Sequence, residues 1–173
     1  NKTTDVTKSP FIVHADDFIY EYQTKKWDSA PIVMKKYKLV FFAVPKVACT
    51  TIKRLFRRMM GYQNFMSQNF RKGLPHNPAR NGLLYLWNYT LEEANHMMTS
   101  PEYTRAIFVR DPKARFMSAY LDKGVANYEN FLVPKCCPRT KNCYGAGGHT
   151  PMSFLSLIQN CSNTHWEPQN HRM

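Results

Sequence analysis

The chain has 173 residues, 43% of them hydrophobic and 14% aromatic, and a formal net charge of +12. This composition predicts a folded domain with its own core and excludes a disordered or fibrous chain. The longest apolar run, Leu39 to Val44, is far shorter than the roughly 20 residues that cross a bilayer. Because the chain starts without Met and stops abruptly, we expect it to be part of a longer protein, with any membrane segment outside it.

Positive charge gathers in one part of the sequence. Eleven Lys or Arg residues and no Asp or Glu lie between Asp28 and Glu92. We expect this segment to face an anion: a nucleic-acid backbone, an acidic membrane, an acidic polysaccharide or a nucleotide phosphate. A solvated basic face also explains the outer residues, but it fits Lys46 poorly, because Lys46 directly follows an apolar strand.

The first recognisable elements follow an N-terminal extension of uncertain structure, residues 1–36. Residues 37–44 predict a buried strand, because aromatic and β-branched residues dominate and the proline that follows cannot donate to a ladder. A helix is predicted from Thr50, where apolar residues recur at helical spacing and basic residues occupy the other face. Gly61 ends this pattern.

The second half of the sequence again predicts a strand followed by a helix. After a long loop over 62–90, the spacing of Thr90 and Glu93 predicts a capping box that opens a helix. A strand over 104–110 and a helix over 112–125 follow. Strand, helix, strand, helix predicts a single α/β domain over 1–173, with a parallel sheet flanked by helices and ligands at the carboxyl ends of the strands.

The loop after the first strand has the properties of an anion site. Lys46 lies in the turn, and Thr50 and Thr51 lie at the helix N-terminus, where free backbone N–H groups favour an anion. The loop resembles a P-loop but contains no glycine, and Lys46 precedes Thr50 by four positions rather than one. We therefore expect it to hold a phosphate but not a wrapped, magnesium-bound triphosphate.

A second anion site is predicted where the second strand ends. Arg110 offers a planar fork of donors, and Ser118 lies on the following helix. Pairing of Arg110 with Asp111 is the alternative. Two phosphate sites on neighbouring strand ends indicate a ligand with phosphates on both sides of a ribose.

These stretches resemble the sulfotransferases that use 3′-phosphoadenosine 5′-phosphosulfate, and among them the Golgi carbohydrate sulfotransferases. "VPKVACTTIKR" is similar to the family's 5′-phosphosulfate loop, "FVRDPKARFMSAYLDK" to its 3′-phosphate motif and "HWEPQ" to a late element. The resemblance implies a three-layer, P-loop-NTPase-like fold that is incomplete at its C-terminal end here. It also implies transfer of a sulfuryl group from this donor to a carbohydrate hydroxyl, with no metal required.

The resemblance assigns roles to individual residues. Lys46 would contact the 5′-phosphosulfate and stabilise the leaving phosphate, which makes it a catalytic candidate. Arg110 and Ser118 would bind the 3′-phosphate, and Arg115 would serve the structure. The other donor-binding candidates are Val47, Ala48, Cys49, Thr50, Thr51 and, more weakly, Lys53.

A base must take the proton of the acceptor hydroxyl. We predict His76 for this role, because it lies in the loop between the two phosphate motifs, where related carbohydrate enzymes carry a histidine. An ordinary loop histidine is the alternative. His96 is the competing candidate, but its amphipathic helix favours a surface or packing role.

The basic segment favours an anionic glycan as acceptor, approached along Arg54, Arg57, Arg58, Arg71, Lys72 and Arg80. Two other classes compete with a sulfotransferase. A P-loop-like kinase or phosphotransferase would need a Walker-type lysine and a metal-binding Asp after a strand. A basic nucleic-acid-binding or polyanion-binding domain would explain the charge, but no recognised binding module is present.

The cysteines and glycosylation motifs favour a secretory compartment. Cys136, Cys137 and Cys143 crowd one loop, where we expect one disulfide in preference to a zinc site. Cys49 is expected to be a small buried filler. Three N-x-S/T motifs start at residues 1, 88 and 160. With the resemblance, these features predict a glycoprotein in the Golgi lumen, the luminal domain of a type II membrane protein.

Overall fold

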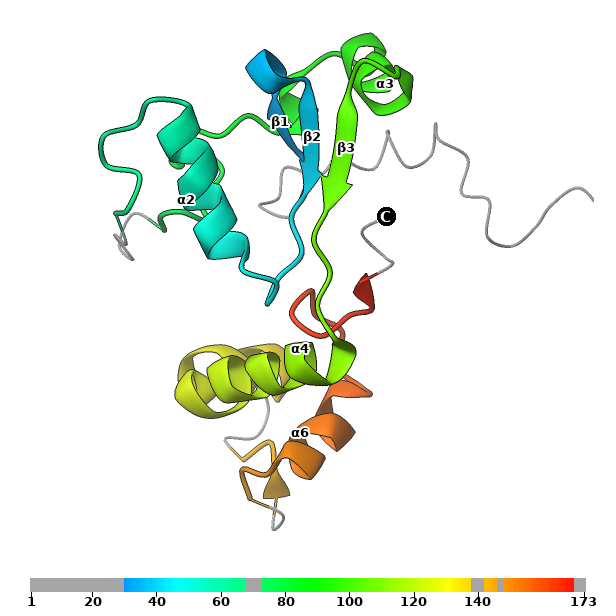
Figure 1. Ribbon diagram of the computed structural model, residues 1–173. Helices are drawn as coiled ribbons and strands as arrows, with labels where there is room; N and C mark the ends of the chain where they lie inside the picture. Colours follow the sequence, from blue (N-terminus) through cyan, green and yellow to red (C-terminus); the bar gives the residue numbers. More distant parts are fainter. Residues whose placement is uncertain (1–29, 68–72, 138–141, 146–147, 170–173) are drawn as a thin grey trace, which may run out of the picture. The chain divides into compact units, whose positions relative to one another are not determined.

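The computed structural model describes residues 30–67, 73–137, 142–145 and 148–169 (Figure 1). These residues form two compact units. The first consists of 30–43 and 50–106, and the second consists of 44–49 and 107–169. The predicted assignment of 1–173 to one domain stays a prediction.

The first unit contains a small sheet with the strand order β1-β2-β3. β1 (Ile32–Met34) and β2 (Leu39–Phe42) pair antiparallel. A 3-10 turn over Lys35–Tyr37 joins them, and Lys38 closes the turn with a left-handed backbone, φ 47°. β1 lies within the predicted N-terminal extension, where the sequence pattern gave no strand.

β3 (Thr104–Ile107) runs in the same direction as β2 (Figure 1). The two strands expected at 37–44 and 104–110 are therefore present in shortened form. The α/β class is confirmed, although the antiparallel β1 makes the described sheet mixed. The three-layer parallel arrangement stays a prediction.

Helix α2 (Cys49–Met59) forms where the apolar spacing predicted it and buries Ile52 and Phe56. The ring of Phe56 packs edge-on against Phe41 of β2, with 5.3 Å between the ring centroids. At the far end Gly61 has φ 86°, which a glycine adopts without steric cost. Its N–H bonds the Arg58 carbonyl, and the next N–H bonds the Arg57 carbonyl, which completes a Schellman motif.

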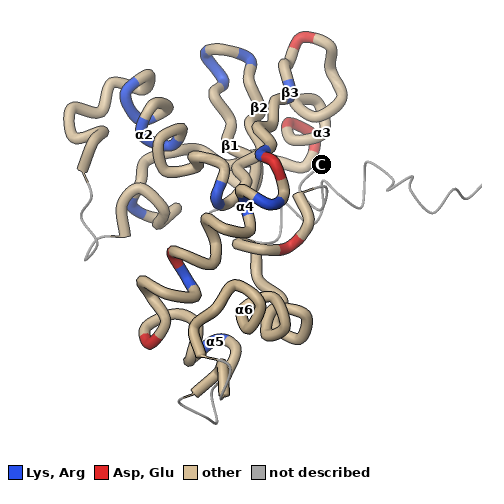
Figure 2. The backbone as a smooth tube through the Cα atoms, turned by 60° about the horizontal axis from the view of Figure 1, so that its bottom comes forward, with Lys and Arg blue, Asp and Glu red and all other residues tan. Residues whose placement is uncertain are grey.

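Figure 2 marks the basic residues of α2 along its backbone. We predicted that all of them lie on the exposed face of the helix, but two are buried. Lys53 is 1% exposed and Arg57 is 2% exposed. Arg57 donates to the carbonyl oxygen of Asn81 and, at 2.7 Å, to Oδ1 of Asn64. Because the loop after α2 covers this face, Arg57 cannot line an approach for an acceptor, and that part of the prediction is wrong.

Asn81 organises the long loop between α2 and α3. Its side chain is fully buried, and its Nδ2 donates to the Pro75 carbonyl at 3.0 Å and to Tyr85 Oη at 2.7 Å. Its Oδ1 accepts from the N–H of Leu83 at 2.9 Å. The loop therefore has a fixed shape over these residues although it lacks regular structure.

Two helical elements follow this loop, a 3-10 turn over Leu86–Asn88 and helix α3 (Leu91–Thr99). The predicted capping box is confirmed. Thr90 Oγ1 accepts from the N–H of Glu93 at 3.2 Å, and the Glu93 carboxylate accepts from the N–H of Thr90 at 3.1 Å.

The second unit is helical. α4 (Pro112–Ala119) continues into two π-helical segments, Tyr120–Ala126 and Tyr128–Leu132, and α5 (Val133–Cys136) follows. α6 (Pro151–Ile158) completes the unit. One cluster of buried side chains forms its core: Ala119, Tyr120, Leu132, Tyr144 and Phe154.

The helix predicted over 112–125 was expected to stop near Gly124, but the helical segment continues through it. Gly124 is buried, and a Cβ atom there would lie 2.6 Å from Tyr144 Oη and 2.9 Å from a ring carbon of Phe154. The glycine therefore permits close packing and does not end the helix.

Two disulfides belong to the second unit, where one was expected. Cys137 pairs with Cys143 within the loop, and Cys136 pairs with Cys161 beyond α6. Cys49 is a free, partly exposed cysteine at the start of α2, so it is not the buried filler that we predicted.

Within the described ranges no helix is long and apolar enough to span a membrane, and no group of three or more His, Cys, Asp or Glu is placed to hold a metal ion.

Candidate functional site

The loop that follows β2 has an unusual backbone. Lys46 has φ 67° and Ala48 has φ 56°, so two residues other than glycine adopt the left-handed conformation. This conformation costs an L-residue roughly 1–2 kcal/mol. The contacts of Lys46 within the second unit hold the loop in this shape.

Lys46 is bonded at both its side chain and its carbonyl group. Its ammonium Nζ lies 2.7 Å from Oδ2 of Asp122, and its side chain is only 16% exposed. Its carbonyl oxygen accepts from Nη1 of Arg110 at 3.3 Å. The ammonium is thereby directed along α4.

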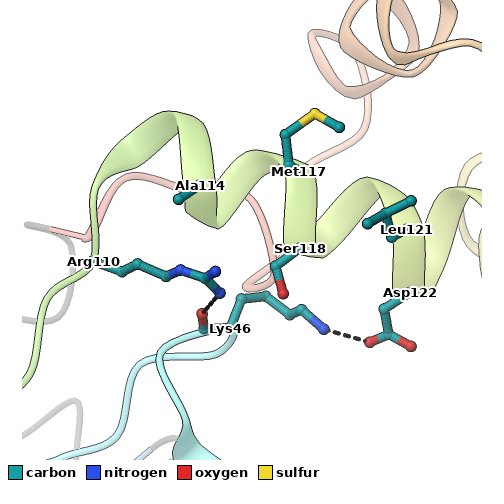
Figure 3. Close-up of a pocket in the computed structure, with 7 residues that line it drawn as sticks. All are labelled: Lys46, Arg110, Ala114, Met117, Ser118, Leu121 and Asp122. Atoms are coloured by element: carbon teal, nitrogen blue, oxygen red, sulfur yellow. Dashed lines mark hydrogen bonds and ion pairs between the residues drawn. The ribbon is translucent and has the colours of Figure 1, made fainter.

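These contacts form one side of a cavity of about 640 Å³ in the second unit (Figure 3). Three residues predicted from the sequence meet there, because Lys46, Arg110 and Ser118 all line the cavity. The remaining lining residues come from α4 and the π-helical turn after it: Ala114, Met117, Leu121 and Asp122.

Helix α4 places its share of these residues by its periodicity. Asp111 caps the helix, because its Oδ1 accepts from the N–H of Ala114 at 2.9 Å. The Asp111 side chain therefore bonds the helix N-terminus instead of pairing with Arg110, which was the alternative. Ala114, Ser118 and Asp122 are spaced by four residues and so follow one face. The N-cap therefore sets where Ser118 and Asp122 meet the cavity.

Asp122 is the functional candidate that the sequence reasoning missed. Its carboxylate lies between two ammonium groups, with Lys123 Nζ at 3.2 Å and Lys46 Nζ at 2.7 Å. Burial raises the pKa of Asp122, but the hydrogen bond from Lys46 and the charges of Lys123 and Lys46 outweigh burial, so the pKa lies below its usual value of 3.8. The spacing of four residues from Ser118 was the available signal.

Arg115 has the structural role that we predicted for it. Its guanidinium group is buried and donates to the carbonyl oxygens of Pro45 at 3.1 Å, Glu167 at 2.6 Å and Thr164 at 2.9 Å. It therefore connects the Lys46 loop to the segment 163–169.

The remaining predicted site residues divide between the two units: Val47, Ala48 and Cys49 follow Lys46 in the second unit, and the first unit holds Thr50, Thr51, Lys53 and His76. Thr50 and Thr51 occupy the first turn of α2, and Thr50 Oγ1 lies 2.9 Å from Nε2 of His76. The structure therefore brings the predicted base into contact with a predicted phosphosulfate-loop residue. His96 is exposed on α3 with its ring edge-on to Tyr103, which agrees with a surface and packing role.

Comparison with known proteins gives a family match. The model of the sulfotransferase family matches residues 30–173. Carbohydrate sulfotransferase 11 of Rattus norvegicus is 34% identical over 99 residues, which is 56% of this chain and 27% of the relative. Carbohydrate sulfotransferase 14 of Mus musculus is 33% identical over 92 residues, 53% of this chain and 23% of the relative.

A longer match is to carbohydrate sulfotransferase 10 of Danio rerio, which is 34% identical over 127 residues, 72% of this chain and 34% of the relative. The chain thus spans about a quarter to a third of the length of these relatives. No solved structure matches the chain.

The lowered pKa of Asp122 predicts how stability depends on pH. Because the folded pKa is lower than the unfolded one, the charged carboxylate adds stability that is complete above about pH 5 and is lost as the pH falls below 3.8 through the folded pKa. We therefore expect Asp122→Asn to lower the free energy of unfolding at pH 7 and to converge with the native chain at low pH. Urea unfolding at several pH values measures this difference.

Glu129→Gln provides the control, because it removes an exposed carboxylate from the next π-helical segment of the same unit. If the difference in free energy of unfolding between Asp122→Asn and the native chain were as large at pH 3 as at pH 7, the lowered pKa of Asp122 would be contradicted.

Proposed function

Because the chain belongs to the sulfotransferase family, we propose that it transfers a sulfuryl group from 3′-phosphoadenosine 5′-phosphosulfate to a hydroxyl group of a carbohydrate. The observation that carries the proposal is the meeting of Lys46, Arg110 and Ser118 around one cavity. The carbohydrate acceptor is supported by the names of the relatives, which are carbohydrate sulfotransferases.

The residues of the cavity fit the two charged ends of this donor. Lys46 would hold the 5′-phosphosulfate, and Arg110 and Ser118 would hold the 3′-phosphate, since a guanidinium fork and a hydroxyl both donate to phosphate oxygens. The residues that follow Lys46 in the chain stay predicted ligands through backbone amides and hydroxyl groups: Val47, Ala48, Cys49, Thr50 and Thr51. We assign no donor contact to Lys53, because its side chain is buried.

Transfer requires that negative charge developing on the leaving phosphate is neutralised. Lys46 is suited to this, because its ammonium group is directed into the cavity by Asp122. The donor's phosphate oxygens would compete with the Asp122 carboxylate for this ammonium. Asp122 thus keeps the lysine aligned until the donor arrives.

His76 is our candidate for the general base that takes the proton of the acceptor hydroxyl group. The hydrogen bond between its Nε2 and Thr50 Oγ1 supports the assignment, because it restrains the imidazole ring. A restrained ring is what general-base catalysis needs, since the base must lie within hydrogen-bond distance of the hydroxyl group.

Three further proposals concern the fold of the chain, the kind of acceptor and the cellular compartment. We propose the three-layer sulfotransferase fold on the basis of the strands β2 and β3, which run in the same direction (Figure 1). An anionic glycan is supported by Arg58 and Arg80, which are exposed; Arg71 and Lys72 lie outside the described residues. Two disulfides support the Golgi lumen, because such bonds persist in oxidising compartments.

Donor binding is tested with the product adenosine 3′,5′-bisphosphate. We expect Lys46→Ala and Arg110→Ala each to weaken its binding about 10- to 100-fold, because a hydrogen bond to a charged group contributes about 1.5–3 kcal/mol. Lys113→Ala is the matched control, since this exposed lysine of α4 does not line the cavity. Calorimetric titration measures the affinities, and binding that both variants leave unchanged would refute the donor site.

The role of His76 is tested by turnover. We expect His76→Ala to lower the rate of sulfuryl transfer by about 10²–10⁴-fold, because general-base catalysis contributes about this much, while binding of adenosine 3′,5′-bisphosphate persists. His96→Ala serves as control, because His96 is the exposed competitor. Labelled donor and a panel of glycans provide the assay, and equal losses in the two variants would remove His76 from the mechanism.

The anionic acceptor is tested by salt. Raising the ionic strength from about 0.01 to 0.15 M shortens the Debye length from roughly 30 to 8 Å, so we expect the KM for a uronic-acid or sulfated glycan to rise and that for a neutral glycan to stay nearly constant. Arg80→Ala should reduce this salt effect, and Lys36→Ala, another exposed basic residue of the first unit, should not. A preference for neutral glycans that is insensitive to salt would exclude the idea.

A further inference from the structure

The side chain of Gln169 bonds both backbone groups of Arg110. Oε1 of Gln169 accepts from the N–H of Arg110 at 2.9 Å, and Nε2 of Gln169 donates to the Arg110 carbonyl oxygen at 2.7 Å. A carboxamide that satisfies an N–H and a C=O of the same residue replaces the two hydrogen bonds that a neighbouring strand would give. It fixes the orientation of that peptide backbone.

Arg110 needs such a partner because regular structure does not restrain it. β3 ends at Ile107 and α4 begins at Pro112, so Arg110 lies in the connection between them, where it is exposed. Among the residues that the structure describes, its guanidinium group makes one hydrogen bond, of 3.3 Å, to the Lys46 carbonyl oxygen. The direction of this side chain into the cavity therefore depends on how its backbone is held.

The segment that carries Gln169 is itself anchored. The carbonyl oxygens of Thr164 and Glu167 accept from the buried guanidinium group of Arg115, at 2.9 and 2.6 Å. Trp166 packs its ring edge-on against Phe154 in the core of the second unit, with centroids 5.5 Å apart. Gln169 is thus held on a fixed support.

We propose that Gln169 is a positioning residue that aims Arg110 at the 3′-phosphate and so sets the preference for donors that carry this group. The proposal rests on the proposed function, because it takes the 3′-phosphate as the ligand of Arg110. Both hydrogen bonds of Gln169 that the described residues show go to the backbone of Arg110, so we expect it to affect the phosphate through Arg110.

The experiment compares two nucleotides that differ only in the 3′-phosphate. Affinities for adenosine 3′,5′-bisphosphate and adenosine 5′-monophosphate are measured for the native chain and for Gln169→Ala, and their ratio reports what the 3′-phosphate contributes. We expect the ratio to fall about tenfold in Gln169→Ala, with the affinity for the monophosphate unchanged. In a chain that already carries Arg110→Ala, the same substitution should change the ratio no further.

Two more variants complete the design. Gln169→Glu keeps an oxygen for the Arg110 N–H but loses the donor to its carbonyl, so its ratio should also fall. Gln159→Ala removes an exposed glutamine at the end of α6 and should leave both affinities unchanged.

Each outcome has a defined meaning. Equal loss for both nucleotides in Gln169→Ala and Gln169→Glu would show a purely structural role and overturn the proposal, and so would an unchanged ratio. If Arg110→Ala alone leaves the ratio unchanged, the 3′-phosphate site of the proposed function fails, and this inference fails with it. A ratio that responds to Arg110→Ala but not to Gln169→Ala refutes the inference alone.

Discussion

The second unit depends on the buried guanidinium group of Arg115. It is 6% exposed, and its hydrogen bonds to three carbonyl oxygens, of Pro45, Thr164 and Glu167, compensate for the loss of water. Through them, one residue of α4 fixes the loop that carries Lys46 and the segment that carries Gln169. Lys46 and Arg110, the residues proposed to bind phosphate, are therefore both supported by Arg115, which does not line the cavity.

The glycine-free loop that carries Lys46 is one of the two segments that Arg115 fixes. Lys46 and Ala48 adopt left-handed backbone conformations that glycine usually takes. The conformation at Lys46 persists because its carbonyl and ammonium groups are both bonded, to Arg110 and Asp122. A loop fixed in this way holds one lysine in a defined direction. That arrangement suits a single phosphosulfate group better than a triphosphate, which a P-loop surrounds with backbone amides.

The sequence allowed the convergence of Lys46, Arg110 and Ser118 to be predicted, because residues at strand ends and along one helix face follow simple periodicities. The capping box at Thr90 could also be predicted, because it depends on residues only three positions apart. The Cys136–Cys161 disulfide, the burial of Arg57 and the partner of Lys46 could not be predicted, since each depends on residues farther along the sequence that only folding brings together. Gly124 misled the prediction, because its lack of a side chain serves packing against Tyr144 rather than helix termination.

We propose above all that the cavity beside Lys46 binds a nucleotide with phosphates on both sides of its ribose. The most direct measurement is a calorimetric comparison of adenosine 3′,5′-bisphosphate with ATP, each with and without Mg²⁺. The sulfotransferase account predicts that the bisphosphate binds more tightly and that Mg²⁺ has little effect on its affinity. Tighter binding of ATP that requires Mg²⁺ would contradict it and favour a phosphotransferase.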